Sequence, residues 1–179
     1  MQFLDAINPV RVYGDLVAFL ETGGNVLFVI MIVTFFMWVL IVERYWYFWT
    51  THPGLVKKAQ DTWDSRTDHR SWYAHQIRNM LISEVSLETR RGIEMIKTMV
   101  AVAPLFGLLG TVTGMVEVFD VMAVTGSSNA RAMASGVSKA TLPTMAGMVA
   151  SLSGLYFSSQ LEQRANREVD RVADHLELR

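Results

Sequence analysis

Residues 103–115 read APLFGLLGTVTGM, and they lie within a stretch of the chain that carries no charged side chain. This uncharged stretch runs from Thr98 to Val116, which is 19 residues. Two others, residues 22–42 and 140–161, are 21 and 22 residues long. A helix needs roughly 20 mostly apolar residues to cross the hydrocarbon core of a bilayer. The sequence therefore predicts an all-α membrane protein with three transmembrane helices.

Two other interpretations of the uncharged stretches are weaker. Buried helices of a soluble protein would suit the third stretch, which is rich in Ser and Thr. They do not suit the first, where residues 26–42 are apolar on every face. A cleaved signal peptide does not suit the first stretch either. Its flank carries Asp15 and Glu21, its apolar run is too long, and no small-x-small cleavage site follows it.

Lysine and arginine are shared unevenly among the segments between the predicted spans. Residues 43–97 hold nine of the 16, and residues 162–179 hold four, whereas the N-terminal arm has only Arg11. Cytoplasmic segments collect these residues, so we expect an outer N-terminus and a cytoplasmic C-terminus. The expected order is an outer amphipathic arm (1–21), span one (22–42), a cytoplasmic helical segment (43–97), span two (98–120), an outer turn (121–139), span three (140–161) and a cytoplasmic tail helix (162–179). Spans two and three are expected to be long helices that extend into the cytoplasm, with span two continuing the helix before it without a break.

Composition excludes several classes of function. The net charge is −1, so no basic field favours nucleic acid, and there is no cysteine. The sequence has no P-loop and no dinucleotide fingerprint. The four histidines do not have the spacing of metal ligands, and no Ser-His-Asp arrangement accompanies a credible pocket. We therefore predict that the protein is not an enzyme and that it uses no cofactor or metal.

Small side chains recur at helical spacing in the second and third spans. In span two they are Ala103, Gly107, Gly110 and Gly114; in span three they are Ala140, Thr144, Gly147, Ser151, Gly154 and Ser158. Small residues let helix backbones approach closely in lipid. These faces are therefore expected to pack against each other, against neighbouring subunits, or around something central.

Threonines and prolines complicate these two faces. A Thr in a membrane helix by default bonds a carbonyl of its own helix, but Thr111 and Thr144 each lie on a small-residue face, where hydroxyls would hold water in hydrocarbon. Pro104 and Pro143 each remove a backbone donor and are expected to kink their helices. No Asp, Glu, His, Lys or Arg lies within the three uncharged stretches. If the protein conducts protons, a second protein with a spanning carboxylate must supply the titrating group.

APLFGLLGTVTGM and KATLPTMAGMVASLSGL, residues 103–115 and 139–155, resemble the two signature membrane segments of the MotA/TolQ/ExbB proton channel family. The resemblance covers roughly residues 90–160, and three spans with an outer N-terminus are closest to a short ExbB variant. It implies a multi-pass protein of the bacterial inner membrane, with the N-terminus in the periplasm. It further implies a homopentamer around an ExbD-like or TolR-like single-span partner that carries the proton-binding aspartate. A TonB-like or TolA-like protein would then transmit the motion to the outer membrane.

The resemblance also implies roles for individual residues. Thr111 and Thr144 match the threonines that face the central lumen in the family. The residues predicted to line the pore are Thr111, Thr144, Gly107, Gly114, Gly147 and Ser151. Many ExbB proteins have a glutamate five residues before the second threonine, where this chain has Lys139. Lys139 is expected either to pair with an acid of the partner or to snorkel to the membrane interface.

Three functions remain open on the sequence. The first is an ExbB-like motor subunit for TonB-dependent uptake, and the second is a TolQ-like subunit for envelope integrity. The third is a membrane scaffold that does not conduct ions, in which the small faces are used up by helix contacts.

Overall fold

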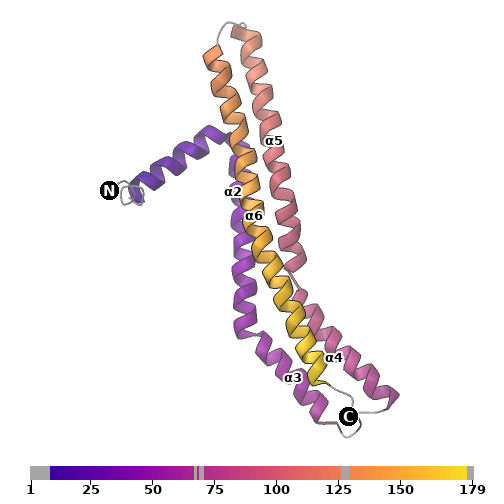
Figure 1. Cartoon of the computed structure of the whole chain (residues 1–179). Helices are drawn as coiled ribbons and strands as arrows, with labels where there is room; N and C mark the ends of the chain where they lie inside the picture. Colours follow the sequence, from indigo (N-terminus) through magenta and orange to yellow (C-terminus); the bar gives the residue numbers. More distant parts are fainter. Residues whose placement is uncertain (1–8, 67, 69–70, 126–129, 177–179) are drawn as a thin grey trace. The chain divides into compact units, whose positions relative to one another are not determined.

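The computed structural model describes residues 9–66, 68, 71–125 and 130–176, and every regular element in these ranges is an α-helix (Figure 1). The helices are α2 (Pro9–Thr50), α3 (His52–Asp64), α4 (Trp72–Arg90), α5 (Ile93–Thr125) and α6 (Ala130–His175). The predicted all-α class is confirmed. Residues 1–8 of the predicted outer arm and residues 126–129 of the predicted outer turn lie outside the described ranges.

Two stretches of the described chain are long and apolar enough to cross a membrane, Gly23–Thr50 and Trp72–Val124. Only 22% of the most apolar window of each is buried within the chain. The predicted third span, in α6, does not pass the same test. Its many glycines, serines and threonines, which suit close helix packing in lipid, contribute little hydropathy.

Contacts divide the chain into two units, and α2, α5 and α6 contribute to both. Unit 1 contains Met1–Phe36 and Met99–Leu152, and unit 2 contains Met37–Thr98 and Ser153–Arg179. In unit 1, α5 and α6 run side by side in opposite directions (Figure 1). The upper part of α2 reaches the same pair, because Val26 lies beside Gly110 of α5. Within α2 the backbone leaves helical geometry at Gly24, which has φ 67° and ψ −164°.

Within the predicted outer segment, residues 121–139, α5 continues to Thr125 and α6 begins at Ala130, on either side of residues 126–129. One expectation about helix boundaries was wrong, since the segment before span two is not one continuous helix. It is interrupted after Asp64 and again at Gly92, whose φ of 80° lies in the left-handed region that favours glycine.

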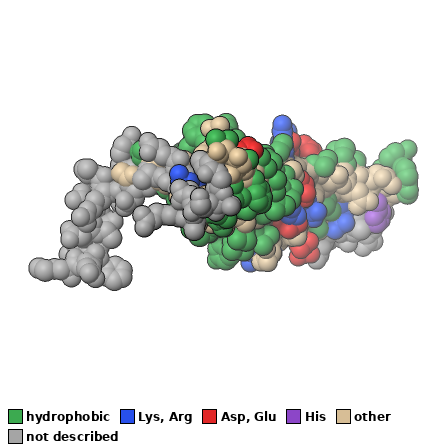
Figure 2. All heavy atoms as spheres, turned by 90° about the horizontal axis from the view of Figure 1, so that it is seen from above, with side chains coloured by type: hydrophobic (Ala, Val, Ile, Leu, Met, Phe, Trp, Pro, Cys, Tyr) green, Lys and Arg blue, Asp and Glu red, His purple; other side chains and the backbone are tan. Residues whose placement is uncertain are grey.

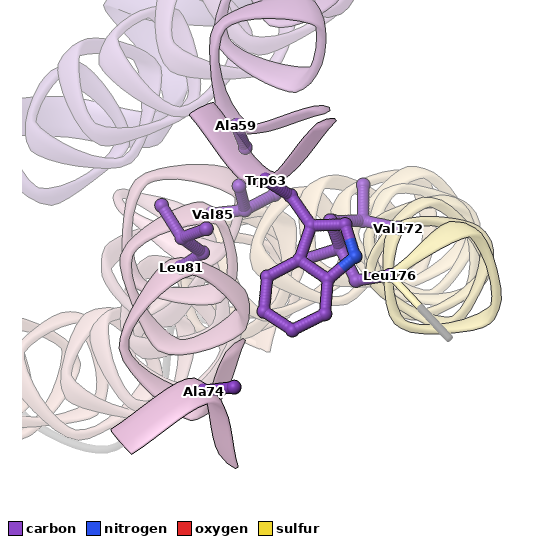
Figure 3. Close-up of a cluster of buried hydrophobic side chains, with 7 residues drawn as sticks. All are labelled: Ala59, Trp63, Ala74, Leu81, Val85, Val172 and Leu176. Carbon is purple, nitrogen blue, oxygen red and sulfur yellow. The ribbon is translucent and has the colours of Figure 1, made fainter. Parts of the chain in front are cut away.

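A cluster of apolar side chains from α3, α4 and the end of α6 forms the core of unit 2 (Figure 3). The indole of Trp63 on α3 lies between residues of α4 and residues of α6, and only 2% of Trp63 is exposed. The buried members are Ala59, Trp63, Ala74, Leu81, Val85, Val172 and Leu176. Ser71 caps α4, because its hydroxyl accepts a hydrogen bond from the backbone N–H of Ala74.

The end of α6 is fixed to α4 by one arginine. Arg78 donates from Nε to the carbonyl oxygen of Leu176 at 2.6 Å and from Nη2 to that of Ala173 at 2.8 Å. These carbonyls are among the last of the helix and have no acceptor role within it. The positive guanidinium also suits the negative end of the helix dipole.

Hydrophobic side chains are exposed over much of the surface (Figure 2). On α5 they include Leu105, Leu108, Val112, Val116 and Phe119, each at least half exposed. A soluble monomer rarely leaves so much contiguous apolar surface in water. This surface is what a lipid-facing or subunit-facing helix requires.

We predict that Trp63→Ala destabilises the core of unit 2 by about 3–5 kcal/mol, because it removes a fully buried aromatic side chain and leaves a cavity. The free energy can be measured from denaturant unfolding of the purified protein in detergent. Trp72→Ala is the matched control, since Trp72 is 67% exposed, and it should change stability by less than about 0.5 kcal/mol. Equal effects of the two substitutions would contradict the assigned core.

Candidate functional site

The backbones of α5 and α6 touch along a seam of small residues in unit 1. A Cβ atom added to Gly107 would lie 2.9 Å from the Cα of Thr144, and one added to Gly147 would lie 2.6 Å from the carbonyl oxygen of Ala103. Gly114 is similarly placed, 2.6 Å from the Cβ of Ala140. Real Cβ atoms essentially never come this close, so the seam exists only because these positions are glycine. The two small-residue faces of the sequence therefore pack against each other.

Two hydroxyl groups cross this seam. Thr144 Oγ1 donates to the carbonyl oxygen of Gly107 at 2.8 Å, and Ser151 Oγ donates to that of Val100 at 2.9 Å. Both bonds leave α6 and end on α5, rather than on the donor's own helix. Each hydroxyl donates its proton in this hydrogen bond, and its oxygen keeps lone pairs that can accept a second hydrogen bond.

The remaining residues of the predicted site differ in their surroundings. Thr111 donates to the carbonyl oxygen of Leu108 in its own helix at 2.7 Å, which is the default role of a membrane threonine. Pro143 is fully buried and packs on Gly110. Both α5 and α6 continue through their prolines, Pro104 and Pro143. Lys139 is exposed.

A group of charged residues flanks the uncharged stretches of α5 and α6 in the sequence. Lys97 Nζ donates to Glu162 Oε1 at 2.6 Å and lies 3.4 Å from Glu94 Oε1. The hydrogen bond to Glu162 raises the pKa of Lys97. Glu94 and Lys97 are an i,i+3 pair on α5, and Glu88 and Arg91 form another i,i+3 pair at 3.7 Å.

Sequence reasoning missed the bond between Lys97 and Glu162 because the two residues are 65 positions apart. It also missed that Thr144 and Ser151 bond across the seam rather than within α6. The two small-residue faces predict that α5 and α6 pack together, but they do not set the register that pairs Gly107 with Thr144.

The described residues contain no group of three or more His, Asp or Glu side chains that could hold a metal ion. The polar chemistry of the site in this part of the chain therefore consists of hydroxyls, backbone carbonyls and one Lys–Glu pair.

The comparison with known protein families agrees with this arrangement of helices. Residues 53–174, more than half of the 179 in the chain, match the model of the MotA/TolQ/ExbB proton channel family. The chain belongs to this family. The match covers α3, α4, α5 and most of α6, and so it includes the whole α5–α6 seam.

Curated relatives carry ExbB names. The biopolymer transport protein ExbB-like 1 of Synechocystis is 37% identical over 95 residues, which cover 50% of this chain and 37% of that protein. The ExbB homolog of Methanothermobacter thermautotrophicus is 30% identical over 104 residues, which cover 58% of this chain and 36% of that protein. The matched stretches thus span about a third of the length of these relatives.

We predict that Gly147→Ala loosens the α5–α6 seam, because its methyl group would meet the backbone oxygen of Ala103. Overpacking of this kind costs about 1–3 kcal/mol. The expected result is a lower unfolding temperature in detergent. Gly54→Ala is the control, since nothing lies within 4 Å of a Cβ at that position. If the two variants unfold at the same temperature as the parent protein, the seam is not as tight as described.

Proposed function

We propose that this protein is an ExbB-like subunit of an inner-membrane proton channel that drives TonB-dependent transport together with an ExbD-like partner. The observation that carries the proposal is the pair of hydroxyls, Thr144 and Ser151, bonded across a glycine seam in stretches of α5 and α6 that have no ionisable residues. Such a seam offers acceptors to a proton but has no group of its own that can titrate.

A partner with one spanning carboxyl group would complete the site. When that carboxyl is protonated it is a neutral donor, and the free lone pairs of Thr144 can accept from it. When the carboxyl is ionised, its burial in hydrocarbon is costly, which favours movement of the carboxylate toward water. Thr111 is proposed to take part from α5, because helical spacing puts it beside the face that contacts α6. The other proposed lining residues, Gly107, Gly114, Gly147 and Ser151, keep this face narrow.

The proposed topology has three spans, a periplasmic N-terminus and a cytoplasmic C-terminus. The excess of lysine and arginine in residues 43–97 and 162–179 supports it. A closed pentamer of this chain, as the family resemblance implies, would cover the apolar side chains that α5 exposes. Lys139, near the outer end of α6, is proposed to reach the membrane interface or an acid of the partner. A TolQ-like role in envelope integrity differs from this proposal in the partner, not in the site.

A non-conducting scaffold is the second candidate, and one observation favours it. The glycines and the Thr144 hydroxyl make their contacts within a single chain, so the small faces are already occupied by helix packing. A scaffold needs these contacts for assembly, but it does not need the hydroxyl oxygens to accept further hydrogen bonds.

We predict that Thr144→Val and Thr111→Val each reduce proton flux by about 10-fold or more, which corresponds to about 1.4 kcal/mol in the barrier. Flux is measured in proteoliposomes that contain this chain and its co-purified single-span partner, with a pH-sensitive dye inside. Valine keeps the volume of threonine and removes only the hydroxyl.

Two controls accompany this measurement. Thr113→Val removes a hydroxyl that bonds only within α5, to Leu109 at 3.0 Å and Gly110 at 3.1 Å, and it should conduct normally. Thr144→Ser should conduct because it keeps the hydroxyl. Parental flux in both the Thr144→Val and Thr111→Val complexes would rule out a role of the two hydroxyls in conduction, whereas absence of flux in the parent complex would rule out the channel and leave the scaffold.

A further inference from the structure

His52 is a buried histidine at the junction of α2 and α3, within unit 2 (Figure 1). It is the first residue of α3, directly after Thr51, and only 4% of it is exposed. Its ring lies against two aromatic rings of α2, with centroids 5.5 Å from that of Phe48 and 6.4 Å from that of Tyr47. A single imidazole therefore fills the junction between two consecutive helices.

The environment of His52 suits a neutral ring. Its Nε2 atom is buried and has no hydrogen-bond partner among the described residues. In a neutral imidazole one nitrogen carries no proton, and leaving that nitrogen unpaired costs less than burying an unpaired charge. The imidazolium form would place a donor and a positive charge at the same position. Burial therefore lowers the pKa of His52.

Two charged residues of α6 act on the same ring in opposite directions. Glu168 raises the pKa of His52, and Arg164 lowers it. Arg164 lies close by, because its guanidinium is 5.3 Å from the centroid of the Phe48 ring. Glu168 is already paired with Arg171 of its own helix at 2.8 Å. The amino end of α3 adds positive partial charge beside His52, which also disfavours an imidazolium.

We propose that His52 is a pH-sensitive contact, which holds α2, α3 and α6 together in unit 2 while its ring is neutral and loosens them when the ring is protonated. The proton comes from water and binds a ring nitrogen, and no other reactant is required. A protonated ring gains by leaving the aromatic contact with Phe48 for water. His52 lies two residues beyond the apolar stretch Gly23–Thr50, so this contact links pH to the junction between an apolar helix and the core around Trp63.

The direction of the pH effect follows from the lowered pKa of His52. The opened state, in which the ring has its ordinary pKa of 6.5, binds more protons than the packed state. The packed state is therefore fully stable above about pH 6.5 and loses stability as the pH falls below that value. His175 has the opposite tendency, because only its protonated form can pair with Asp64, 3.9 Å away.

The test measures hydrogen exchange of the backbone amides of α3 in the purified full-length protein in detergent, at pH 7.5 and pH 5.5. Protection factors are compared, since these remove the pH dependence of chemical exchange itself. We expect the opened population to rise by about 3- to 10-fold at pH 5.5, because one pH unit below the ordinary pKa the opened state binds its proton about tenfold. NMR signals of labelled histidine follow the protonation of His52 directly.

His52→Phe is the decisive variant, because it keeps an aromatic ring that cannot be protonated. Its protection should be the same at both pH values. His75→Phe is the matched control, since His75 is exposed on α4, and it should keep the parental response. A histidine with only a packing role would give no pH response in the parent protein either.

Two further variants keep the imidazole, and so they test the inference even where His52→Phe does not fold. Glu168→Gln should move the protonation of His52 to lower pH, and Arg164→Gln should move it to higher pH. Equal protection of the parent protein at both pH values overturns the inference, as does a parental response in folded His52→Phe or an unmoved titration in both α6 variants. None of these outcomes bears on proton conduction, which the flux measurement above tests separately.

Discussion

Backbone contact between α5 and α6 is the constraint on which the rest of the structure depends. Water cannot drive two apolar helices together inside a bilayer, so their association rests on close packing and on bonds between polar groups. Glycine at positions 107 and 147 permits that packing, because any larger side chain would meet backbone atoms of the other helix. The same closeness brings a Thr144 hydroxyl within hydrogen-bond distance of a carbonyl on α5.

The polar groups of the seam follow from the solvent. In hydrocarbon an unpaired donor costs several kcal/mol, so the hydroxyl protons of Thr144, Ser151 and Thr111 all go to backbone carbonyls. The hydroxyl oxygens can still accept hydrogen bonds, because each has two lone pairs and only one proton. A seam built in this way is stable by itself and can still receive a hydrogen bond. Lys97 and Glu162 form their ion pair outside the uncharged stretches, where their side chains are 35% and 45% exposed.

Unit 2 shows how a small core is reinforced by polar contacts. Its helices are short, and the apolar cluster around Trp63 is small. Arg78 adds two hydrogen bonds to the end of α6, and Lys97 joins α5 to α6. The break at Gly92 is fixed as well, since a Cβ atom there would lie 2.8 Å from Nε of the buried Arg44.

The sequence by itself determined the helical class, the uncharged stretches and the two small-residue faces, because each is a local pattern with the period of a helix. It did not predict that α4 and α5 are separate helices, since the Arg44 side chain that lies against the left-handed Gly92 comes from a distant part of the chain. Nor did it predict the bonds of Thr144 and Glu162. Only the tertiary structure decided those, because they depend on the register of two antiparallel helices, and helical periodicity within either one carries no information about that register.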